Sequence, residues 1–186
     1  MSKRNIPPSE ALYPLPVVLV SCLDRSNDKA CAITIAWCGV IASKPPQIYV
    51  SIRPSRYSHK IIESEREFVV NIPSKDIMSQ VDFCGTHSGR NTDKFKECSF
   101  KAIPSSKIAS PMISECPVNI ECRLKDILRL GSHDAFIGEV VAVHTDEKII
   151  DEKGKIDYEK AKPFVYNQGE YWDLGKKIGY YGCSCR

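Results

Sequence analysis

The segment SIRPSRYSHK, residues 51–60, gathers hydroxyl and cationic side chains in a short stretch of chain. Arg53 and Arg56 could each hold two oxygens of a phosphate group, because the guanidinium group is a planar fork of donors. Ser51 and Ser58 could add hydroxyl hydrogen bonds to the same anion. The alternative is a solvated basic turn, in which the cations pair with the carboxylates of Glu63, Glu65 and Glu67. The local sequence leaves both interpretations open.

The pattern around this segment predicts where a bound anion would lie. Residues 47–54, QIYVSIRP, alternate between apolar and polar side chains, which is typical of a β-strand with one buried face. Ser51 and Arg53 fall together on the other face. The sequence that follows the strand, SHKIIESER, is long enough for about two helical turns, with Ser58 or Ser55 as its N-cap. Because the amino end of a helix offers free N–H groups and a positive dipole, a phosphate would be well bound there.

A stripe of small side chains precedes this strand. In residues 30–41, ACAITIAWCGVI, an extended chain would place Ala32, Thr34 and Ala36 on one face. Small side chains let a flat ring approach the strand closely, so that backbone N–H groups could bond its edge. The alternative is close packing against another strand or a helix, which is the default use of small residues.

A second cationic group lies in THSGRNTDKF, residues 86–95. Arg90 and Lys94 stand near Ser88 and a glycine, so a flexible loop could add donors to an anion. Alternatively, Asp93 pairs locally with a neighbouring cation. The sequence favours neither interpretation.

His133 and Asp134 invite the hypothesis of a catalytic dyad. Adjacent residues of a strand point to opposite faces, however, and no G-x-S-x-G accompanies them. The sequence therefore gives little support to a hydrolase. Three aromatic residues further along could stack on an aromatic ligand or pack in the core, namely Tyr166, Tyr171 and Trp172.

Length and composition narrow the class of protein. A chain of 186 residues suits a single domain, residues 1–186, with a substantial core. Its net charge of +3 and pI near 8.3 fall short of the strong basic bias of a nucleic-acid binder. No apolar run approaches the roughly 20 residues that span a bilayer, and no hydrophobic stretch follows the basic start. We therefore expect a cytoplasmic protein that binds neither nucleic acid nor membrane.

Nine cysteines are many for a chain of this length. Their number is odd and no C-x-x-C occurs, so a disulfide framework is not expected. Zinc and iron–sulfur sites usually use at least one close thiolate pair, and the only close pair here is Cys183 and Cys185. We expect no metal site, and we expect buried, reduced thiols that act as small hydrophobic side chains.

The order of the elements predicts a mainly β fold with few helices. Strands are expected at 16–23, 30–41, 47–54, 67–73, 118–130 and 133–147, and short helices at 58–66, 75–84 and 91–98. Strands at such short spacing favour an antiparallel barrel over a doubly wound sheet. Since neither a Rossmann fingerprint nor a Walker loop is present, a bound nucleotide would be held by other means.

Taken together, these segments resemble the flavin reductase-like proteins, which are split β-barrels that bind FMN, and within them the flavoredoxins. The matching stretches are TIAWCGVIASKPPQIYVSIRPSRYS, EFVVNIP, DFCGTHSGRNTDKF, ECPVNIECRL, GSHDAFIGEVVAVH and GEYWDLGKKIG. They cover most of the chain between about residues 14 and 180, in family order. The resemblance implies a Greek-key split β-barrel and a homodimer, with FMN bound noncovalently near the subunit interface.

The resemblance also implies which residues bind the cofactor. The stretch from Thr34 to Trp37 would lie along the isoalloxazine ring, and the segment after residue 50 would surround the phosphate. Relatives commonly carry Asn where this chain has Cys31, so a contact with the flavin is lost or replaced, and a thiol there could take part in redox chemistry. The expected cofactor-binding residues are Cys31, Thr34, Ile35, Ala36, Trp37, Ser51, Arg53, Arg56, Tyr57, Ser58, Ser88, Arg90 and Lys94.

The function that the resemblance implies is the transfer of reducing equivalents through FMN, with the chemistry supplied by the cofactor and no side chain required as acid or base. In one version the protein is an enzyme that oxidises NADH or NADPH. In the other it is an electron carrier that serves redox proteins such as a ferredoxin-like partner, without direct oxidation of NAD(P)H. A binding module with no redox role is a third, more distant alternative.

Overall fold

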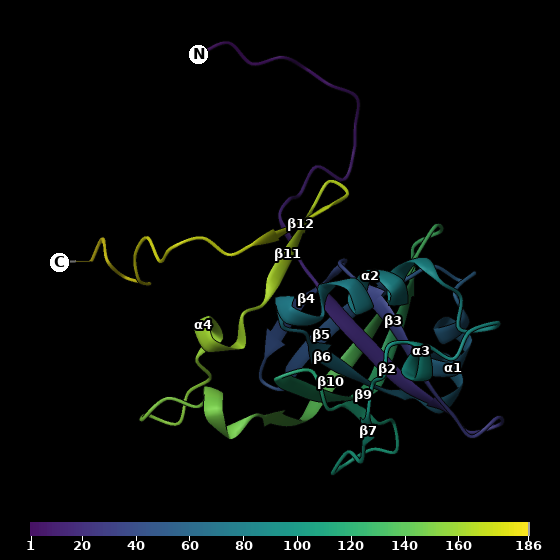
Figure 1. Ribbon diagram of the computed structural model, residues 1–186. Helices are drawn as coiled ribbons and strands as arrows, with labels where there is room; N and C mark the ends of the chain where they lie inside the picture. The colour runs from purple at the N-terminus through teal and green to yellow at the C-terminus, as the bar shows by residue number, and fades with distance from the viewer. Residues whose placement is uncertain (186) are drawn as a thin grey trace.

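The structure is a computed structural model that describes residues 1–185, and it consists mainly of β-strands (Figure 1). Its largest element is a seven-stranded antiparallel sheet with the order β3-β2-β6-β9-β10-β5-β4. The strands are β2 (Val18–Asp24), β3 (Lys29–Ile35), β4 (Cys38–Ser43), β5 (Pro46–Ile52), β6 (Glu67–Ile72), β9 (Val118–Arg129) and β10 (Asp134–Thr145). The prediction of a mainly β fold is confirmed.

The sheet closes on itself at Ala36 and Trp37. β3 and β4 lie at opposite ends of the strand order, yet only these two residues separate them in the chain. Ile35 still pairs with β2, whereas the Trp37 carbonyl accepts a hydrogen bond from the Ser51 N–H of β5 at 2.8 Å. The two edges therefore lie side by side, as in a split barrel. The predicted single strand over 30–41 is wrong, because barrel closure bends the chain at its middle.

The alternation of strand residues fills the barrel interior. Val50 and Ile52 on β5 are fully buried, at 0% and 1% exposed, as the pattern of residues 47–54 predicts. They pack in one apolar cluster with Phe68 of β6 and Phe136 of β10. Because the side-chain period of a strand is two, the residues between them are left to face outward.

A second apolar cluster lies on the other face of β2 and β3. Two helices cover this face (Figure 1), α2 (Met78–Thr86), which follows the 3₁₀ turn η1 (Lys75–Ile77), and α3 (Lys94–Glu97). Leu19 and Ala32 from the strands meet Val81 of α2 there. The short strands β7 (Ala102–Ile103) and β8 (Met112–Ile113) pair beside this layer.

The helix starts differ from the predicted ones. α1 (Tyr57–Glu65) has Arg56 as its N-cap, with no side-chain hydrogen bond to the cap, so the prediction of Ser58 or Ser55 as the N-cap is wrong. α3 is much shorter than predicted, because Asp93 caps it by accepting a bond from the Lys96 N–H. The first residues of the predicted helix at 75–84 form the 3₁₀ turn instead.

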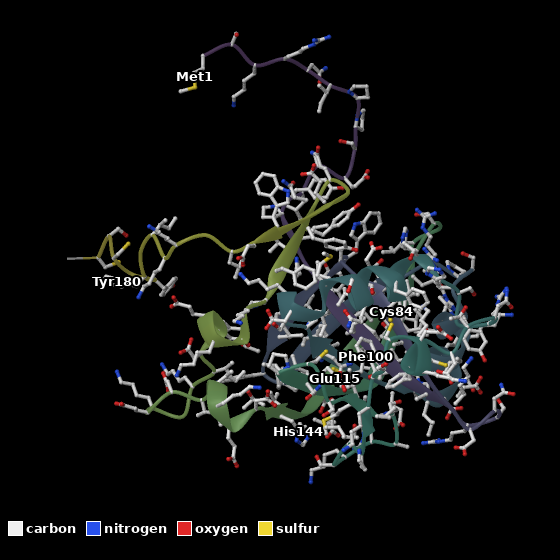
Figure 2. All side chains as sticks on the ribbon, viewed as in Figure 1. Met1, Cys84, Phe100, Glu115, His144 and Tyr180 are labelled. Carbon is white, nitrogen blue, oxygen red and sulfur yellow. The ribbon has the colours of Figure 1, made fainter. Side chains whose placement is uncertain are left out.

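Strands from near both ends of the chain pair in a separate small sheet. It contains β1 (Leu15–Pro16), β11 (Phe164–Asn167) and β12 (Glu170–Asp173), and the turn η2 (Glu147–Ile149) and helix α4 (Tyr158–Ala161) lead into it. Residues 1–14 and 174–185 extend beyond this sheet, away from the barrel (Figure 1). Figure 2 shows Met1 and Tyr180 far out on these two segments.

Candidate functional site

A pocket of about 230 Å³ opens where the barrel is split. Its walls come from the bend between β3 and β4, from the end of β5 and from the residues just before α1. Seven residues of the predicted set line it, and the structure brings them together: Thr34, Ile35, Ala36, Trp37, Ser51, Arg53 and Arg56.

The backbone of β3 forms one wall of this pocket. β3 is an edge strand of the seven-stranded sheet, paired on one side with β2. In an antiparallel edge strand, alternate residues direct their N–H and C=O groups away from the paired neighbour. These groups can bond the rim of a flat polar ring lying along the strand.

The side chain of Thr34 does not point at this wall. Its hydroxyl donates to the carbonyl of Val81 on α2 at 2.5 Å, and a Cβ added at Gly85 would lie 3.3 Å from the Thr34 Cβ. Ala32 is buried in the same layer. Ala32 and Thr34 thus pack against a helix, as the alternative interpretation predicts, whereas Ala36 lines the pocket. The backbone of β3 remains available to bond a ligand in the pocket.

Within residues 1–185, Arg53, Arg56 and Lys60 have no carboxylate partner, whereas His59 lies 2.7 Å from Asp134 and 3.8 Å from Glu63. Glu63 pairs with Arg129, while Glu65 and Glu67 pair with Arg25. Arg53 and Arg56 line the pocket and join no ion pair in the described part of the chain. These three glutamates therefore do not neutralise Arg53 or Arg56, and only His59 of this segment pairs with one of them.

The first turn of α1 adds to the positive charge at this end of the pocket. The helix has nine residues, its first turn contains no acidic residue, and no side chain caps its free N–H groups. A helix start that has neither an acidic residue nor a capping side chain carries an uncompensated positive dipole end. An anion at this point would satisfy both the N–H groups and the dipole.

Lys94 is a buried cation near the same end of the pocket. Its side chain is only 5% exposed, and its Nζ donates to the carbonyl of Cys84 at 2.5 Å. Burial lowers the pKa of Lys94, and the charge of Arg56 lowers it further. Among residues 1–185 no carboxylate pairs with it. A buried charge without a counter-charge is costly, and a bound anion would supply that counter-charge.

The loop before Lys94 lies over the start of α1. Lys29 holds the loop by donating to the carbonyl of Gly89 at 2.9 Å. A Cβ added at Gly89 would lie 3.0 Å from the Tyr57 ring, so a larger residue here would have to push this ring aside. Arg90 reaches the carbonyl of Ser55 at 3.5 Å. Ser88 is exposed on the loop, where its hydroxyl accepts from the Arg90 N–H.

Tyr57 and Ser58 direct their side chains into the protein. The Tyr57 hydroxyl donates to Asp24 at 2.6 Å, an interaction that helps lower the pKa of Asp24 to about 2. Ser58 is buried beside Cys22, where its hydroxyl partly offsets the raising of the thiol pKa by Cys31 and by burial. Both residues fix the position of the helix start, to which they contribute backbone N–H groups.

Cys31 lies in the barrel interior and does not line the pocket. It stands opposite Cys22 in the β2–β3 ladder, and its Sγ donates to the Lys29 carbonyl at 3.6 Å. The neighbouring Cys22 thiol lowers the pKa of Cys31, and the charge of Lys29 does so as well. Direct contact between this thiol and a ring in the pocket is not part of the observed geometry.

Four residues that line the pocket are not among the expected cofactor-binding residues, although Tyr166 is one of the aromatic residues considered above for stacking on a ligand. The His133 ring contacts the Trp37 ring in a tilted arrangement, with centroids 4.4 Å apart and planes at 38°, and the pKa of His133 is lowered by burial and by Arg53. As predicted, the neighbouring Asp134 points elsewhere, into a buried contact with His59 at 2.7 Å. The pairing of β10 with β5 carries His133 to the pocket, a long-range event that leaves no local signal. These four residues are Ile33, Ile52, His133 and Tyr166.

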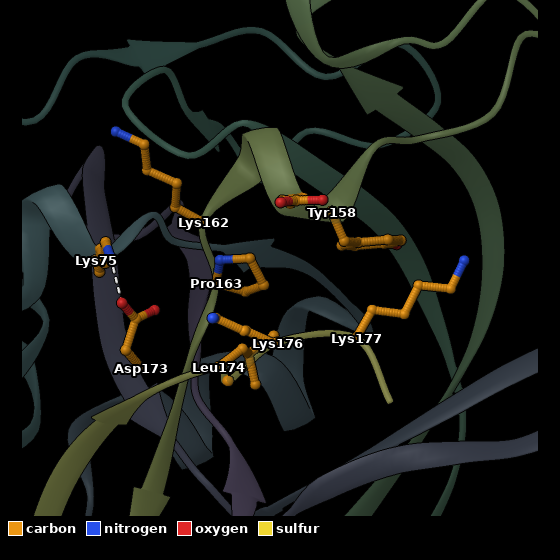
Figure 3. A pocket seen from close by; sticks show the side chains of 10 residues that line it. Lys75, Tyr158, Lys162, Pro163, Asp173, Leu174, Lys176 and Lys177 are labelled. Atoms are coloured by element: carbon orange, nitrogen blue, oxygen red, sulfur yellow. Dashed lines mark hydrogen bonds and ion pairs between the residues drawn. The ribbon is translucent and has the colours of Figure 1, made fainter. Parts of the chain in front are cut away.

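A larger pocket lies elsewhere in the structure. It measures about 590 Å³ and is formed by α4, residues 162–163 and residues 173–177. Figure 3 shows its lysine side chains and the ion pair between Lys75 and Asp173. None of the predicted site residues lines it. Within residues 1–185 there is no cluster of potential metal ligands, and no helix is long and apolar enough to cross a membrane.

The site combines a flat pocket and a cationic end. A strand edge and the adjoining rings of Trp37 and His133 border the pocket. Arginines, a buried lysine and an uncapped helix start form its charged end. These residues fit a group that joins a planar, hydrogen-bonding ring to a phosphate.

Comparisons with known proteins agree with this geometry. Residues 10–175 match the model of the flavin reductase like domain. An uncharacterized protein of Archaeoglobus fulgidus is 34% identical over 171 residues, which are 88% of this chain and 94% of that protein.

Two solved structures are similar over nearly the whole chain. The flavoredoxin of Desulfovibrio vulgaris (Miyazaki F) has a TM-score of 0.93 at 29% identity and covers 100% of both chains. The flavoredoxin from Methanosarcina acetivorans has a TM-score of 0.86 at 27% identity, covering 98% of this chain and 99% of the other. These matches support a flavin cofactor and a flavin-dependent redox function. The chain belongs to the flavin reductase-like family, in its flavoredoxin-like subgroup.

Proposed function

We propose that this protein binds FMN noncovalently in the split of the barrel and transfers electrons through it. The observation that carries the proposal is the pair of arginines without counter-charge in the pocket, Arg53 and Arg56, together with the buried Lys94 whose charge interacts with that of Arg56. A single phosphate group would offset most of this positive charge and could accept hydrogen bonds from the arginines. The family membership supports a flavin as the group that carries the phosphate.

Each part of the pocket has a distinct role in this proposal. Arg53, Arg56 and the first N–H groups of α1 hold the phosphate, and Lys94 neutralises it from the buried side. The backbone of residues 33–36 bonds the edge of the ring. Trp37 covers part of the ring and, together with His133, keeps water from this part of the pocket.

FMN supplies the redox chemistry, because its ring can take up and release one or two electrons. The protein supplies position and charge. Backbone donors from the edge of β3 stabilise negative charge that develops on the ring edge facing them. The lowered pKa of His133 favours its neutral form, so this ring adds no fixed positive charge to the pocket near neutral pH.

The electron donor that we propose is NADH or NADPH, which makes the protein an FMN-dependent oxidoreductase. The second candidate is a carrier that exchanges electrons with redox proteins of the ferredoxin type, and its support is the similarity to two flavoredoxins. Anaerobic mixing separates the two. Rapid bleaching of the flavin absorption by NADH or NADPH supports the enzyme. Bleaching by reduced ferredoxin, with neither nucleotide effective, supports the carrier.

We also propose that two copies of the chain form a homodimer. β4 is the other edge strand of the sheet, and Val40 on it is 77% exposed. Apolar side chains along the extended terminal segments are also exposed, among them Leu12 and Ile178. A second copy would cover such surfaces, which a monomer rarely leaves open. Light scattering on the purified protein tests this, and a monomer mass at micromolar concentration would contradict it.

The cysteines support a cytoplasmic location for this function. All nine are free thiols in the structure, a state that a reducing compartment maintains. Fractionation of cells that express the tagged protein would test the location.

A further inference from the structure

Cys183 and Cys185 differ from the other cysteines in their exposure. They are the two exposed cysteines of the chain, and the other seven are buried. Burial raises the pKa of Cys38, Cys84 and Cys122 to about 12, which suppresses the thiolate that reacts. The C-S-C pair is therefore the place in this chain where thiol chemistry is open to a reaction partner.

The pair stands on residues 174–185, here called the C-terminal arm, which starts at the larger pocket and follows the β11–β12 hairpin that reaches the flavin pocket. Tyr171 of β12 pairs with Tyr166 of β11, and Tyr166 lines that pocket. The ion pair between Lys75 and Asp173 fixes the start of the arm (Figure 3). Within the described residues, the backbone hydrogen bonds beyond this point join arm residues to each other.

The arm is long enough to carry the two thiols far from its anchored start. When extended, residues 172–183 span at most about 40 Å, at ~3.4 Å per residue. The observed arm points away from the barrel (Figure 1), with its side chains in solvent. An arm that is fixed at one end and free along its length can present Cys183 and Cys185 at the pocket mouth of its own chain or of a second copy.

The spacing of the two cysteines suits reversible oxidation. A disulfide across a single intervening residue closes a small, strained ring, and strained, exposed disulfides are the readily reduced ones. Buried structural disulfides lack both properties.

We propose that Cys183 and Cys185 form a dithiol–disulfide couple that accepts two electrons from the reduced flavin and passes them to a disulfide-containing acceptor. This proposal rests on the proposed function, and it adds disulfide reduction to that function. In the first step the S–S bond between the two cysteines breaks. Its sulfurs take two electrons and two protons from the reduced cofactor, which returns to its oxidised form.

The second step is thiol–disulfide exchange. One thiolate of the arm attacks the acceptor disulfide, forms a mixed disulfide and releases the first acceptor thiol. The second thiolate of the arm then attacks the mixed disulfide and releases the other acceptor thiol. The acceptor leaves as two thiols, and the arm returns to its disulfide form. The acceptor class is a small-molecule or protein disulfide.

The test counts electrons and thiols in the flavin-loaded protein. The arm is first oxidised with a mild disulfide reagent, and the protein is then titrated anaerobically with dithionite. The wild-type protein is expected to take up about twice as many electrons per flavin as the Cys183→Ser/Cys185→Ser double variant, because the arm adds a second two-electron couple. After the titration, alkylation and mass measurement of the tryptic peptide 178–186 should show two free thiols.

Two controls make the result specific. Ser184→Ala keeps both thiols and should match the wild type in electron uptake. Protein stripped of flavin should keep the disulfide in peptide 178–186 under the same titration, which excludes direct reduction by dithionite. Equal uptake in the wild type and the double variant, with the disulfide intact, would overturn the couple while leaving the flavin function standing. A colourless protein that takes up no added FMN would overturn both.

Discussion

The Ser51 N–H donates to the Trp37 carbonyl at 2.8 Å, and this bond marks the point where the chain has left one edge of the sheet for the other. On one side of it lies the free edge of β3, and on the other lie the end of β5 and the start of α1. The split of the barrel thus places a hydrogen-bonding strand edge beside a helix start. The proposed FMN site uses both.

Replacing Arg53 with alanine is expected to weaken FMN binding by about 10- to 100-fold, the usual loss for a hydrogen bond to a charged group. The side chain is exposed and lines the pocket, so the free energy of unfolding of the FMN-free protein should change little. Lys60→Ala removes an exposed cation from α1 and serves as the matched control, with unchanged affinity expected. Fluorescence titration with FMN measures both. Full affinity for FMN in Arg53→Ala would show that Arg53 does not bind the cofactor.

Replacing Lys94 with methionine should act in opposite directions on the two forms of the protein. The FMN-free protein should gain about 1 kcal/mol in the free energy of unfolding at neutral pH, because a buried charge without a partner is removed. FMN should bind at least about tenfold more weakly, since the phosphate loses its buried counter-charge. Urea unfolding and FMN titration provide the two measurements, with Lys96→Met, an exposed lysine of α3, as the control.

The pH dependence of stability checks the same assignment. Because burial lowers the pKa of Lys94 in the folded protein, the cost of its charge is full below that lowered pKa. This cost disappears as the pH rises through the lowered pKa toward the usual 10.5. The FMN-free wild type should therefore gain stability relative to Lys94→Met over this range. A constant difference between the two proteins would contradict the assignment.

The local sequence predicts which strand residues of the site share a face, but it does not predict the contacts that depend on long-range strand pairing. The alternation in residues 47–54 suffices to place Ser51 and Arg53 on one face, because a strand has a fixed period. The bend at Ala36 and the arrival of His133 depend on barrel closure and on the pairing of β10 with β5. Such long-range pairing leaves no mark in a short window of sequence.

The helix start shows the limit of capping rules. Ser58 is a good N-cap by residue type, yet it is buried in the first turn and Arg56 occupies the cap. The hydrogen bond from Tyr57 to Asp24 helps set this register, and it joins residues that are far apart in sequence. Lys94 was predicted from the resemblance, whereas its burial could be known only from the packed structure.

Acid should weaken the contact between α1 and the β2–β3 turn. The hydrogen bond from Tyr57, followed by those from Asn27 and Ser26, lowers the pKa of Asp24 from 3.8 to about 2. The stability that Asp24 contributes is therefore fully present above the unfolded pKa and is lost as the pH falls toward 2. In Tyr57→Phe this acid-dependent loss should be smaller. Thermal unfolding of the wild type and of Tyr57→Phe between pH 5 and 2 measures this loss. The same dependence of stability on pH in both proteins would contradict the role given to the Tyr57–Asp24 hydrogen bond.

Gly138 of β10 should tolerate no side chain. A Cβ at this position would lie 2.6 Å from the ring of Phe68 and 2.9 Å from the Cβ of Cys122. Gly138→Ala is expected to lower the free energy of unfolding by about 1–3 kcal/mol through overpacking of the core. Gly175→Ala, where a Cβ meets nothing within 4 Å, should stay within about 0.5 kcal/mol of the wild type. Urea unfolding of both variants makes the comparison, and equal stabilities would show that the core yields at β10.

The most direct test of the proposed site compares the affinities of FMN and riboflavin, which share the ring and differ by the phosphate. If Arg53, Arg56, Lys94 and the start of α1 hold a phosphate, FMN should bind at least about 100-fold more tightly than riboflavin, since several charge-assisted bonds are at stake. The preference should shrink in Arg53→Ala and in Lys94→Met. Equal affinities for FMN and riboflavin in the wild-type protein would contradict the account.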